Sequence, residues 1–157
     1  MGWGNPTALL LGALVLLLVS AGIQDARVRE IANWKNAAIA LLAPLWWWAN
    51  GLQMWPDMAV QLGVAVTVLG LFCVAFHFGW MGGGDVKMIG ALALWFPFAA
   101  LSWLLIVMSL VGGALTIVMM IEQKLKKKSG GIEIPYGVAI AIAALFAIRE
   151  PIFNQFT

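Results

Sequence analysis

The chain has few charged side chains for its length. Of its 157 residues, 10% are charged and 63% are hydrophobic, whereas soluble domains carry roughly 25% charged residues. A soluble fold with so few charges could not cover its surface with polar groups, so lipid must be the solvent for most of the outside. The composition therefore excludes an ordinary soluble protein and predicts an integral membrane protein in contact with the lipid bilayer.

Cysteine and histidine are almost absent, which excludes several kinds of site. Cys73 and His77 are the only residues of their types. One cysteine cannot form an intrachain disulfide, and no cluster of cysteine and histidine suggests a metal. Nothing near His77 supports a Ser-His-Asp or Cys-His enzyme. We therefore expect no metal and no other cofactor. The basic residues form no face suited to nucleic acid, so we expect no nucleic-acid partner.

Long apolar stretches make up most of the chain, and a membrane-spanning helix needs about 20 apolar residues. The expected helical stretches are Thr7–Ile23, Asn36–Trp48 with an extension to about Gln53, Met58–Phe78, Val86–Ile121, and Tyr136–Ile148 with an extension towards Phe153. No Lys or Arg precedes the first stretch, so we expect a retained helix there and not a cleaved signal peptide.

The stretch Val86–Ile121 is too long for one helix. It would measure roughly 54 Å, against a hydrocarbon core of about 30 Å, so we expect Pro97 to break it into two helices. Basic residues favour the cytoplasm, and placing both Arg27 and Lys124–Lys128 there requires an even number of crossings between them. We predict an all-α, polytopic membrane protein of about six transmembrane helices, in one domain over residues 1–157, with both termini outside the cytoplasm.

The tryptophans are expected at the two membrane interfaces, the usual place for tryptophan in membrane proteins. Under the six-helix scheme the outer interface would hold Trp3, Trp46, Trp47, Trp48, Trp55, Trp95 and Trp103, and the inner one Trp34 and Trp80. None is assigned to a cofactor.

Two of the scarce acidic residues lie beside apolar helices on the predicted cytoplasmic side. Asp25 follows the first apolar stretch, and Asp85 precedes the one that begins at Val86. Placing an acidic side chain at membrane depth costs free energy, so a residue of this kind points to a functional site. Each has a structural alternative, because Asp25 could pair with Arg27 or Arg29 and Asp85 could cap a helix. Together, two carboxylates that share a site can activate a water molecule.

Three glycines, Gly82, Gly83 and Gly84, precede Asp85. Glycine permits unusual backbone angles and a close approach of other backbone, which would suit a substrate strand passing the carboxylate. A plain loop is the alternative, and the Walker phosphate-binding pattern is absent. Lys87 either favours ionisation of a nearby aspartate or extends its ammonium group to the membrane surface.

Three segments resemble the type IV prepilin peptidases, in particular the small Flp/tad-type members. Asp25–Asn33 is similar to the first aspartate motif of that family, Gly82–Met88 to its Gly-x-Gly-Asp-x-Lys motif, and Ile134–Ile140 to its closing Pro-Tyr-Gly segment. Ala32 stands where the family usually has a proline that would stiffen the loop after the first aspartate, which leaves the geometry of that loop open.

The resemblance implies an aspartic endopeptidase with Asp25 and Asp85 as its catalytic pair, supported by Gly82, Gly84 and Lys87. It would remove the basic leader from an Flp-like prepilin at the cytoplasmic face of the bacterial inner membrane, beside the pilus assembly machinery. The large bifunctional members also carry a tetracysteine zinc segment and a methyltransferase activity. This chain lacks those cysteines, so we expect cleavage without methylation.

Other functions are compatible with the same residues. The substrate could instead be a preflagellin or another membrane helix. A non-catalytic scaffold or transport protein could use the acids to bind ions, although we find no inverted repeat and no charge at the membrane midplane that would favour transport.

Overall fold

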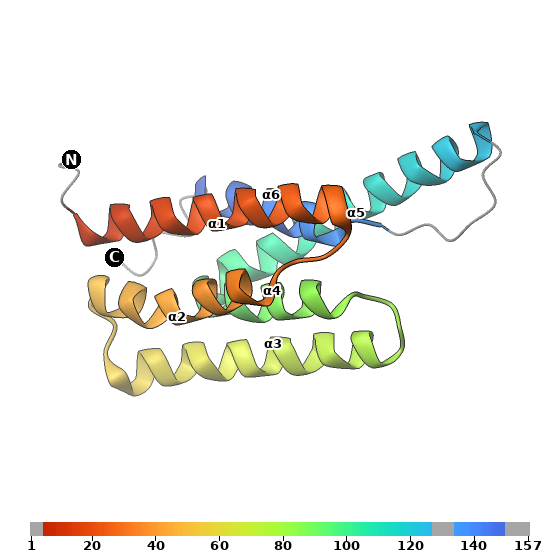
Figure 1. Ribbon diagram of the computed structural model, residues 1–157. Coiled ribbons are helices and arrows are strands. Elements are labelled where there is room, and N and C mark those ends of the chain that lie inside the picture. The colour runs from red at the N-terminus through yellow and green to blue at the C-terminus, as the bar shows by residue number, and fades with distance from the viewer. Residues whose placement is uncertain (1–4, 127–133, 150–157) are drawn as a thin grey trace.

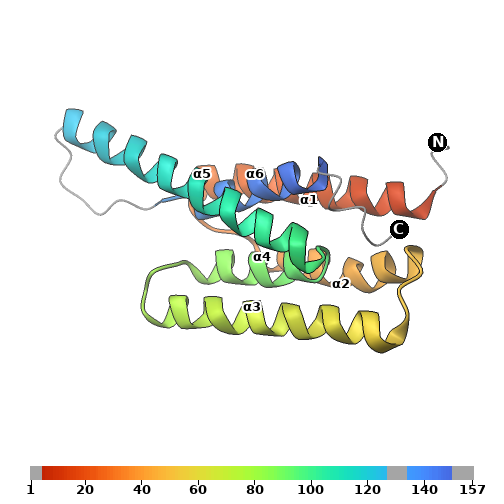
Figure 2. The same cartoon turned by 180° about the vertical axis from the view of Figure 1, so that it is seen from behind.

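The computed structural model describes residues 5–126 and 134–149, and these residues form helices and connecting turns without any strand (Figure 1). The helices are α1 (Pro6–Val28), α2 (Asn33–Ala49), α3 (Ala59–His77), α4 (Gly83–Ala93), α5 (Phe98–Leu125) and α6 (Tyr136–Arg149), with a short helical segment η1 (Met54–Met58) before α3. Helices that follow one another in the chain run in opposite directions (Figures 1 and 2). The expected all-α class is confirmed.

Helix α1 is longer than the apolar stretch that predicted it. Asn5 caps its start, because the Asn5 side chain accepts a hydrogen bond from the backbone N–H of Thr7 at 3.2 Å. The helix continues to Val28 and closes at Arg29, whose φ of 57° is left-handed and whose N–H donates to the carbonyl oxygen of Asp25. Asp25 therefore lies within the helix, near its C-terminal end, and not in the loop that follows.

The expected break at Pro97 is present. Helix α4 ends at Ala93, and Pro97 immediately precedes α5 with an extended backbone (φ −60°, ψ 158°). Gln61 of α3 holds this turn, since its side-chain nitrogen donates to the carbonyl oxygens of Ala93 at 2.7 Å and Phe96 at 2.6 Å. With 11 residues, α4 is about 16 Å long, too short to cross a hydrocarbon core of about 30 Å by itself.

Three stretches of the described residues are long and apolar enough to cross a membrane, namely Pro6–Val28, Met54–His77 and Phe98–Leu125. Helices α2, α4 and α6 are shorter. The chain is therefore membrane-like in composition and helix length, and the number of helices agrees with the sequence analysis. That all six of them cross the bilayer stays a prediction.

Helix α4 occupies the interior of the bundle, where it packs against α2, α3 and α6. Its residues from Met88 to Ala93 are all buried. Gly90 permits close packing of α3, because a Cβ there would lie 2.7 Å from the Leu69 side chain. By contrast α3 buries few of its side chains and exposes large apolar ones such as Val66 and Leu71. Apolar side chains on the outside and a packed interior are what lipid contact requires.

Trp46, Trp47 and Trp95, which the sequence analysis placed near the outer membrane interface, are buried within the protein and so contact other helices. The rings of Trp46 and Trp95 stack with centroids 5.5 Å apart. The indole N–H of Trp47 donates to Leu94 O and that of Trp95 to Ile39 O, both at 2.7 Å. An apolar run does not distinguish a side chain that faces lipid from one that faces another helix.

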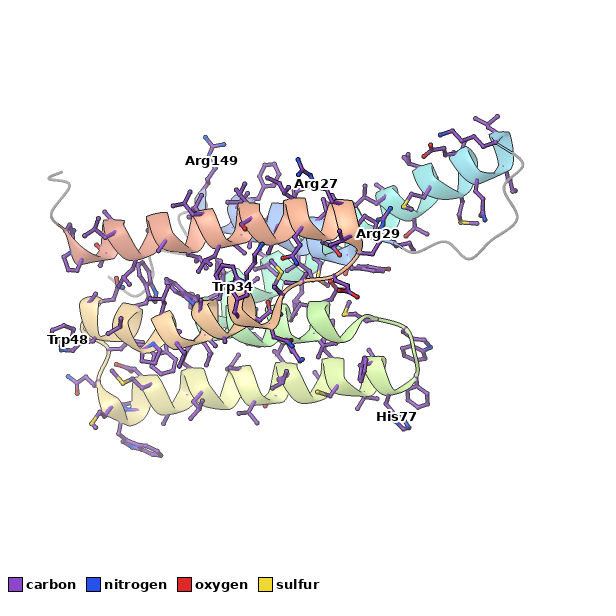
Figure 3. All side chains as sticks on the ribbon, in the orientation of Figure 1. Arg27, Arg29, Trp34, Trp48, His77 and Arg149 are labelled. Carbon is purple, nitrogen blue, oxygen red and sulfur yellow. The ribbon has the colours of Figure 1, made fainter. Side chains whose placement is uncertain are left out.

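The remaining described tryptophans are exposed, as Figure 3 shows for Trp34 and Trp48. They are Trp34, Trp48, Trp55, Trp80 and Trp103. Other expectations concerned Trp3, Lys127, Lys128 and Phe153, which lie outside the described residues.

Candidate active site

Asp25 is buried near the C-terminal end of α1, where that helix packs against α6. One of its carboxylate oxygens, Oδ2, accepts a hydrogen bond from the backbone N–H of Val138 at 3.2 Å. Val138 lies in the first turn of α6, and its N–H is shared between Asp25 and the carbonyl oxygen of Pro135, which it reaches at 3.1 Å. The start of α6 therefore serves as the docking point for this carboxylate.

Gly137 makes this contact sterically feasible. A Cβ at Gly137 would lie 2.8 Å from Asp25 Oδ2 and 2.7 Å from the Ile31 side chain, so that no larger residue fits without a shift. The sequence analysis noted the Pro-Tyr-Gly segment but did not assign Gly137 to the site. The motif was the available signal, but the contact joins residues too far apart in the chain to be visible in local sequence.

Asp85 lies in the first turn of α4, which begins at Gly83 with Gly82 as its N-cap residue. The structural alternative, in which Asp85 caps a helix starting at Val86, is therefore excluded. Its side chain is buried. A Cβ on Gly82 would approach Asp85 Oδ2 to 3.1 Å, which indicates that the missing side chain makes room for the carboxylate.

The other two glycines of this segment differ in how closely neighbouring side chains approach them. A Cβ on Gly83 would lie 3.3 Å from the Phe76 ring, and one on Gly84 would lie 3.4 Å from Ile31 Cβ. Gly82 has a φ of −71°, and the described positive-φ glycines lie elsewhere in the chain. Close packing thus favours glycine at Gly82 and Gly83, whereas a Cβ at Gly84 would make only an ordinary contact, and none of the three has a positive φ.

Asp25 and Asp85 line the same cavity, of about 330 Å³, at the end of the bundle where α1 ends and α2, α4 and α6 begin. Its lining residues are Asp25, Arg29, Glu30, Ile31, Asn33, Gly82, Gly83, Gly84 and Asp85. The structure therefore brings together the two acids that the sequence analysis singled out. Figure 3 shows Arg29 at this end of the molecule, remote from Trp48 at the other.

Electrostatics favour a shared proton in this cavity. Asp85 lies outside the three stretches long enough to cross a membrane. Burial raises the pKa of its carboxyl to about 7, with a further increase from the negative charge of Asp25 and an opposing effect of the Gly82 backbone. At neutral pH a substantial fraction of Asp85 is therefore protonated.

Lys87 does not line the cavity that holds the two acids. Its ammonium group donates to the side-chain oxygen of Asn33 at 2.9 Å, and Asn33 is itself a lining residue of that cavity. Lys87 is therefore linked to the cavity of the two acids by way of Asn33.

In the loop between α1 and α2, the backbone conformation at position 32 is one that proline could adopt. Ala32 has φ −61° and ψ 131°, values that proline adopts without strain. Its N–H donates to the Gln24 side chain over a long 3.4 Å. The alanine therefore leaves the loop in a proline-compatible conformation, which answers the question that the sequence left open.

The described residues offer no obvious site for a metal ion, since no three of their His, Cys, Asp or Glu side chains lie close enough to hold one. The cavity does contain two buried carboxylates from distant parts of the chain, and Arg29 also lines it. Such an arrangement can hold a proton and an activated water molecule.

Comparison with known protein families matches residues 12–117 to the type IV leader peptidase family. No curated protein and no solved structure gave a significant match. The matched region includes both acids and the three glycines, but it ends before Gly137. It covers most of the chain, and it agrees with the apolar helices and with the sequence resemblance. The chain therefore belongs to the type IV leader peptidase family and is a membrane protease of that kind.

Proposed function

We propose that this protein is a prepilin leader peptidase: an aspartic endopeptidase that removes the basic leader from an Flp-like prepilin. Asp25 and Asp85 are its catalytic pair. The observation that carries this proposal is that two buried carboxylates, from α1 and α4, line one cavity at one end of the bundle. A structural role for either acid alone would not require the two carboxylates to lie in one cavity.

The chemistry uses one proton shared by the pair. The protonated carboxyl donates a hydrogen bond to the scissile carbonyl, while the ionised one removes a proton from water as the water attacks. Burial and the neighbouring charge favour Asp85 as the protonated member. The pair titrates as a unit, and the reaction forms no covalent intermediate.

The position of the cavity supports cleavage at the cytoplasmic face of the bacterial inner membrane. Arg27 and Arg29 lie at this end of the bundle (Figure 3), and the far end of α5, which carries Lys124 and Lys126, extends in the same direction (Figure 1). Basic residues favour the cytoplasmic side. A prepilin with its leader in the cytoplasm and its apolar helix in the bilayer would present the junction to this cavity. The pilus assembly machinery would then receive the mature pilin, without methylation by this chain.

The test is cleavage of an Flp-like prepilin by purified enzyme in lipid vesicles, followed by mass spectrometry. The wild type should shorten the prepilin by the mass of its leader. Asp25→Asn and Asp85→Asn should each reduce the rate by about 10²-fold or more, while Asp57→Asn, an exposed acid outside the cavity, should cleave as the wild type does. Normal cleavage by either cavity variant would refute the catalytic assignment, and a product other than the leader-free pilin would refute the substrate.

A further inference from the structure

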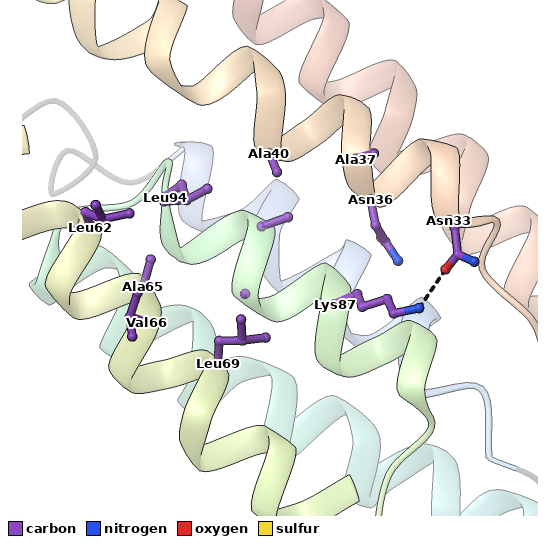
Figure 4. Close-up of a pocket in the computed structure, with 12 residues that line it drawn as sticks. Asn33, Asn36, Ala37, Ala40, Leu62, Ala65, Val66, Leu69, Lys87 and Leu94 are labelled. Atoms are coloured by element: carbon purple, nitrogen blue, oxygen red, sulfur yellow. Dashed lines mark hydrogen bonds between the residues drawn. The ribbon is translucent and has the colours of Figure 1, made fainter.

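A second cavity, an apolar groove of about 490 Å³, lies between α2, α3 and α4 (Figure 4). Its lining residues are Asn33, Asn36, Ala37, Ala40, Leu62, Ala65, Val66, Leu69, Lys87, Gly90, Ala91 and Leu94. On α2 the lining covers residues 33–40, so the groove is about 10 Å long, or roughly two helical turns.

The groove is polar at one end only. Asn33, Asn36 and Lys87 supply all of its polar side chains, and they lie together at the end where α2 and α4 begin (Figure 4). Towards Leu62 and Leu94, at the opposite end, every lining side chain is apolar. A ligand that fits this surface has a polar part joined directly to an apolar part.

The polar end of the groove adjoins the cavity of the two acids. Asn33 lines both, and the side-chain nitrogen of Asn36 donates to the carbonyl oxygen of Gly84 at 3.1 Å. Gly84 is next to Asp85 in the chain. The groove is therefore continuous with the proposed catalytic site through residues that touch both.

Asn36 also carries an unused hydrogen-bond acceptor. Its side chain is only 4% exposed, and within the described part of the chain its Oδ1 has no partner. The orientation of the amide is fixed, because the carbonyl oxygen of Gly84 can only accept and must face the nitrogen. A buried acceptor without a partner costs about 1–3 kcal/mol, and because solvent does not reach this oxygen, a ligand lying in the groove does not reach it either.

Small residues make the walls of the groove suitable for another helix. Ala37 and Ala40 line it from α2, Ala65 from α3, and Gly90 and Ala91 from α4. In membranes, helices associate where small side chains let their backbones come close. A phospholipid also joins a polar headgroup to apolar tails, but a tail needs no close approach of backbones and gives no reason for small residues on all three helices.

We propose that this groove is the docking site for the substrate's membrane helix, in the two turns that follow the cleaved bond. This inference rests on the proposed function above. The apolar side chains of the substrate helix lie along α2, α3 and α4, and its first turn lies at the polar end, beside Asn33 and Lys87. The leader then continues past Asn33 into the cavity of the acids.

Crosslinking on α3 tests the location. Val66 lines the groove, whereas Leu71 is similarly exposed and lies about 140° further around the same helix, outside the groove. A benzophenone amino acid is placed at either position in Asp85→Asn enzyme, which would bind prepilin without cleaving it. With an Flp-like prepilin in lipid vesicles, irradiation should attach the prepilin at position 66 and not at position 71.

Kinetics of groove-filling variants give a second readout in enzyme that keeps both acids. Val66→Trp should raise KM by about tenfold, equal to about 1.4 kcal/mol of lost binding, with kcat little changed, while Leu71→Trp should leave both constants as they are. Crosslinking only to lipid at position 66, equal crosslinking at both positions, or an unchanged KM in Val66→Trp would overturn the groove assignment. If the wild type cleaves prepilin in those same vesicles, the proposed function survives that result; if it does not, both proposals fail.

Discussion

The two ends of this helix bundle both bury polar side chains, but they leave them in different states. At the end near Pro97, Gln61 donates to two backbone carbonyl oxygens, and the indole N–H groups of Trp47 and Trp95 each have a carbonyl acceptor. At the other end two carboxylates face a cavity. Satisfied polar groups rigidify a fold, whereas groups left open to a cavity are available for chemistry.

The comparison also explains why glycines lie beside the two carboxylates, at the end of the bundle that we call the acidic end. A Cβ at Gly82 or Gly137 would crowd a carboxylate of Asp85 or Asp25. Buried like charges and glycines near a helix start both reduce stability. The indole and amide hydrogen bonds at the opposite end can offset part of that cost. The difference predicts that changes at the acidic end affect cleavage first, and changes at the other end affect stability first.

Among substitutions that leave both acids in place, the largest effect is expected from Gly137→Ala. The new methyl group would meet the carboxylate of Asp25 and the side chain of Ile31 at under 3 Å, which displaces a group that the reaction uses. We expect cleavage to fall by about 10²-fold, although alanine is the better helix former. Gly113→Ala is the matched control, since a Cβ there meets nothing within 4 Å. Equal rates for the two variants would show that Gly137 does not position Asp25.

A pH profile tests the acidic end next. The pKa of Asp85 is raised to about 7, so its proton is present at lower pH and is lost as the pH rises through that value. If the reaction needs this proton, kcat/KM should fall above pH 7 by about tenfold per unit. Initial cleavage rates in vesicles between pH 6 and pH 9 would measure the fall. A rate that keeps rising to pH 9 would argue against a protonated carboxyl.

At the opposite end, Gln61→Leu should act on stability. It would leave the carbonyl oxygens of Ala93 and Phe96 without this donor, at a cost of about 1–3 kcal/mol in the free energy of unfolding. Thr67→Val, which removes an exposed hydroxyl bond on the same helix, should cost much less. Denaturant unfolding in micelles measures both variants. If Gln61→Leu enzyme were fully folded but did not cleave, the claim that this end of the bundle affects stability before cleavage would be wrong.

The smallest effect is expected from Ala32→Pro. The φ of Ala32 already suits proline, so the substitution should stabilise the protein by about 0.4–1 kcal/mol through the unfolded state, less the weak bond to Gln24. Cleavage should be retained. A destabilised variant would mean that the bond to Gln24 matters more than its length suggests.

Local sequence patterns predicted the all-α class, the break at Pro97 and the placement of the two acids at one end, because helix periodicity, proline and charge act over short distances. They did not predict the burial of Trp46 or Trp95, since hydropathy treats lipid and a neighbouring helix alike. Nor did they reveal the bond from Val138 to Asp25. Such contacts depend on how helices pack in three dimensions, which no short segment determines.

Single and double substitutions of the two acids test the central claim most directly. Residues that act as one catalytic unit give non-additive losses. Rates of prepilin cleavage should fall to the same residual level in Asp25→Asn, in Asp85→Asn and in the enzyme that carries both. If instead the fold loss of rate in the double variant equalled the product of the losses in the two single variants, the acids would not share one reaction and the account would be wrong. The same would follow if one single variant cleaved at the wild-type rate.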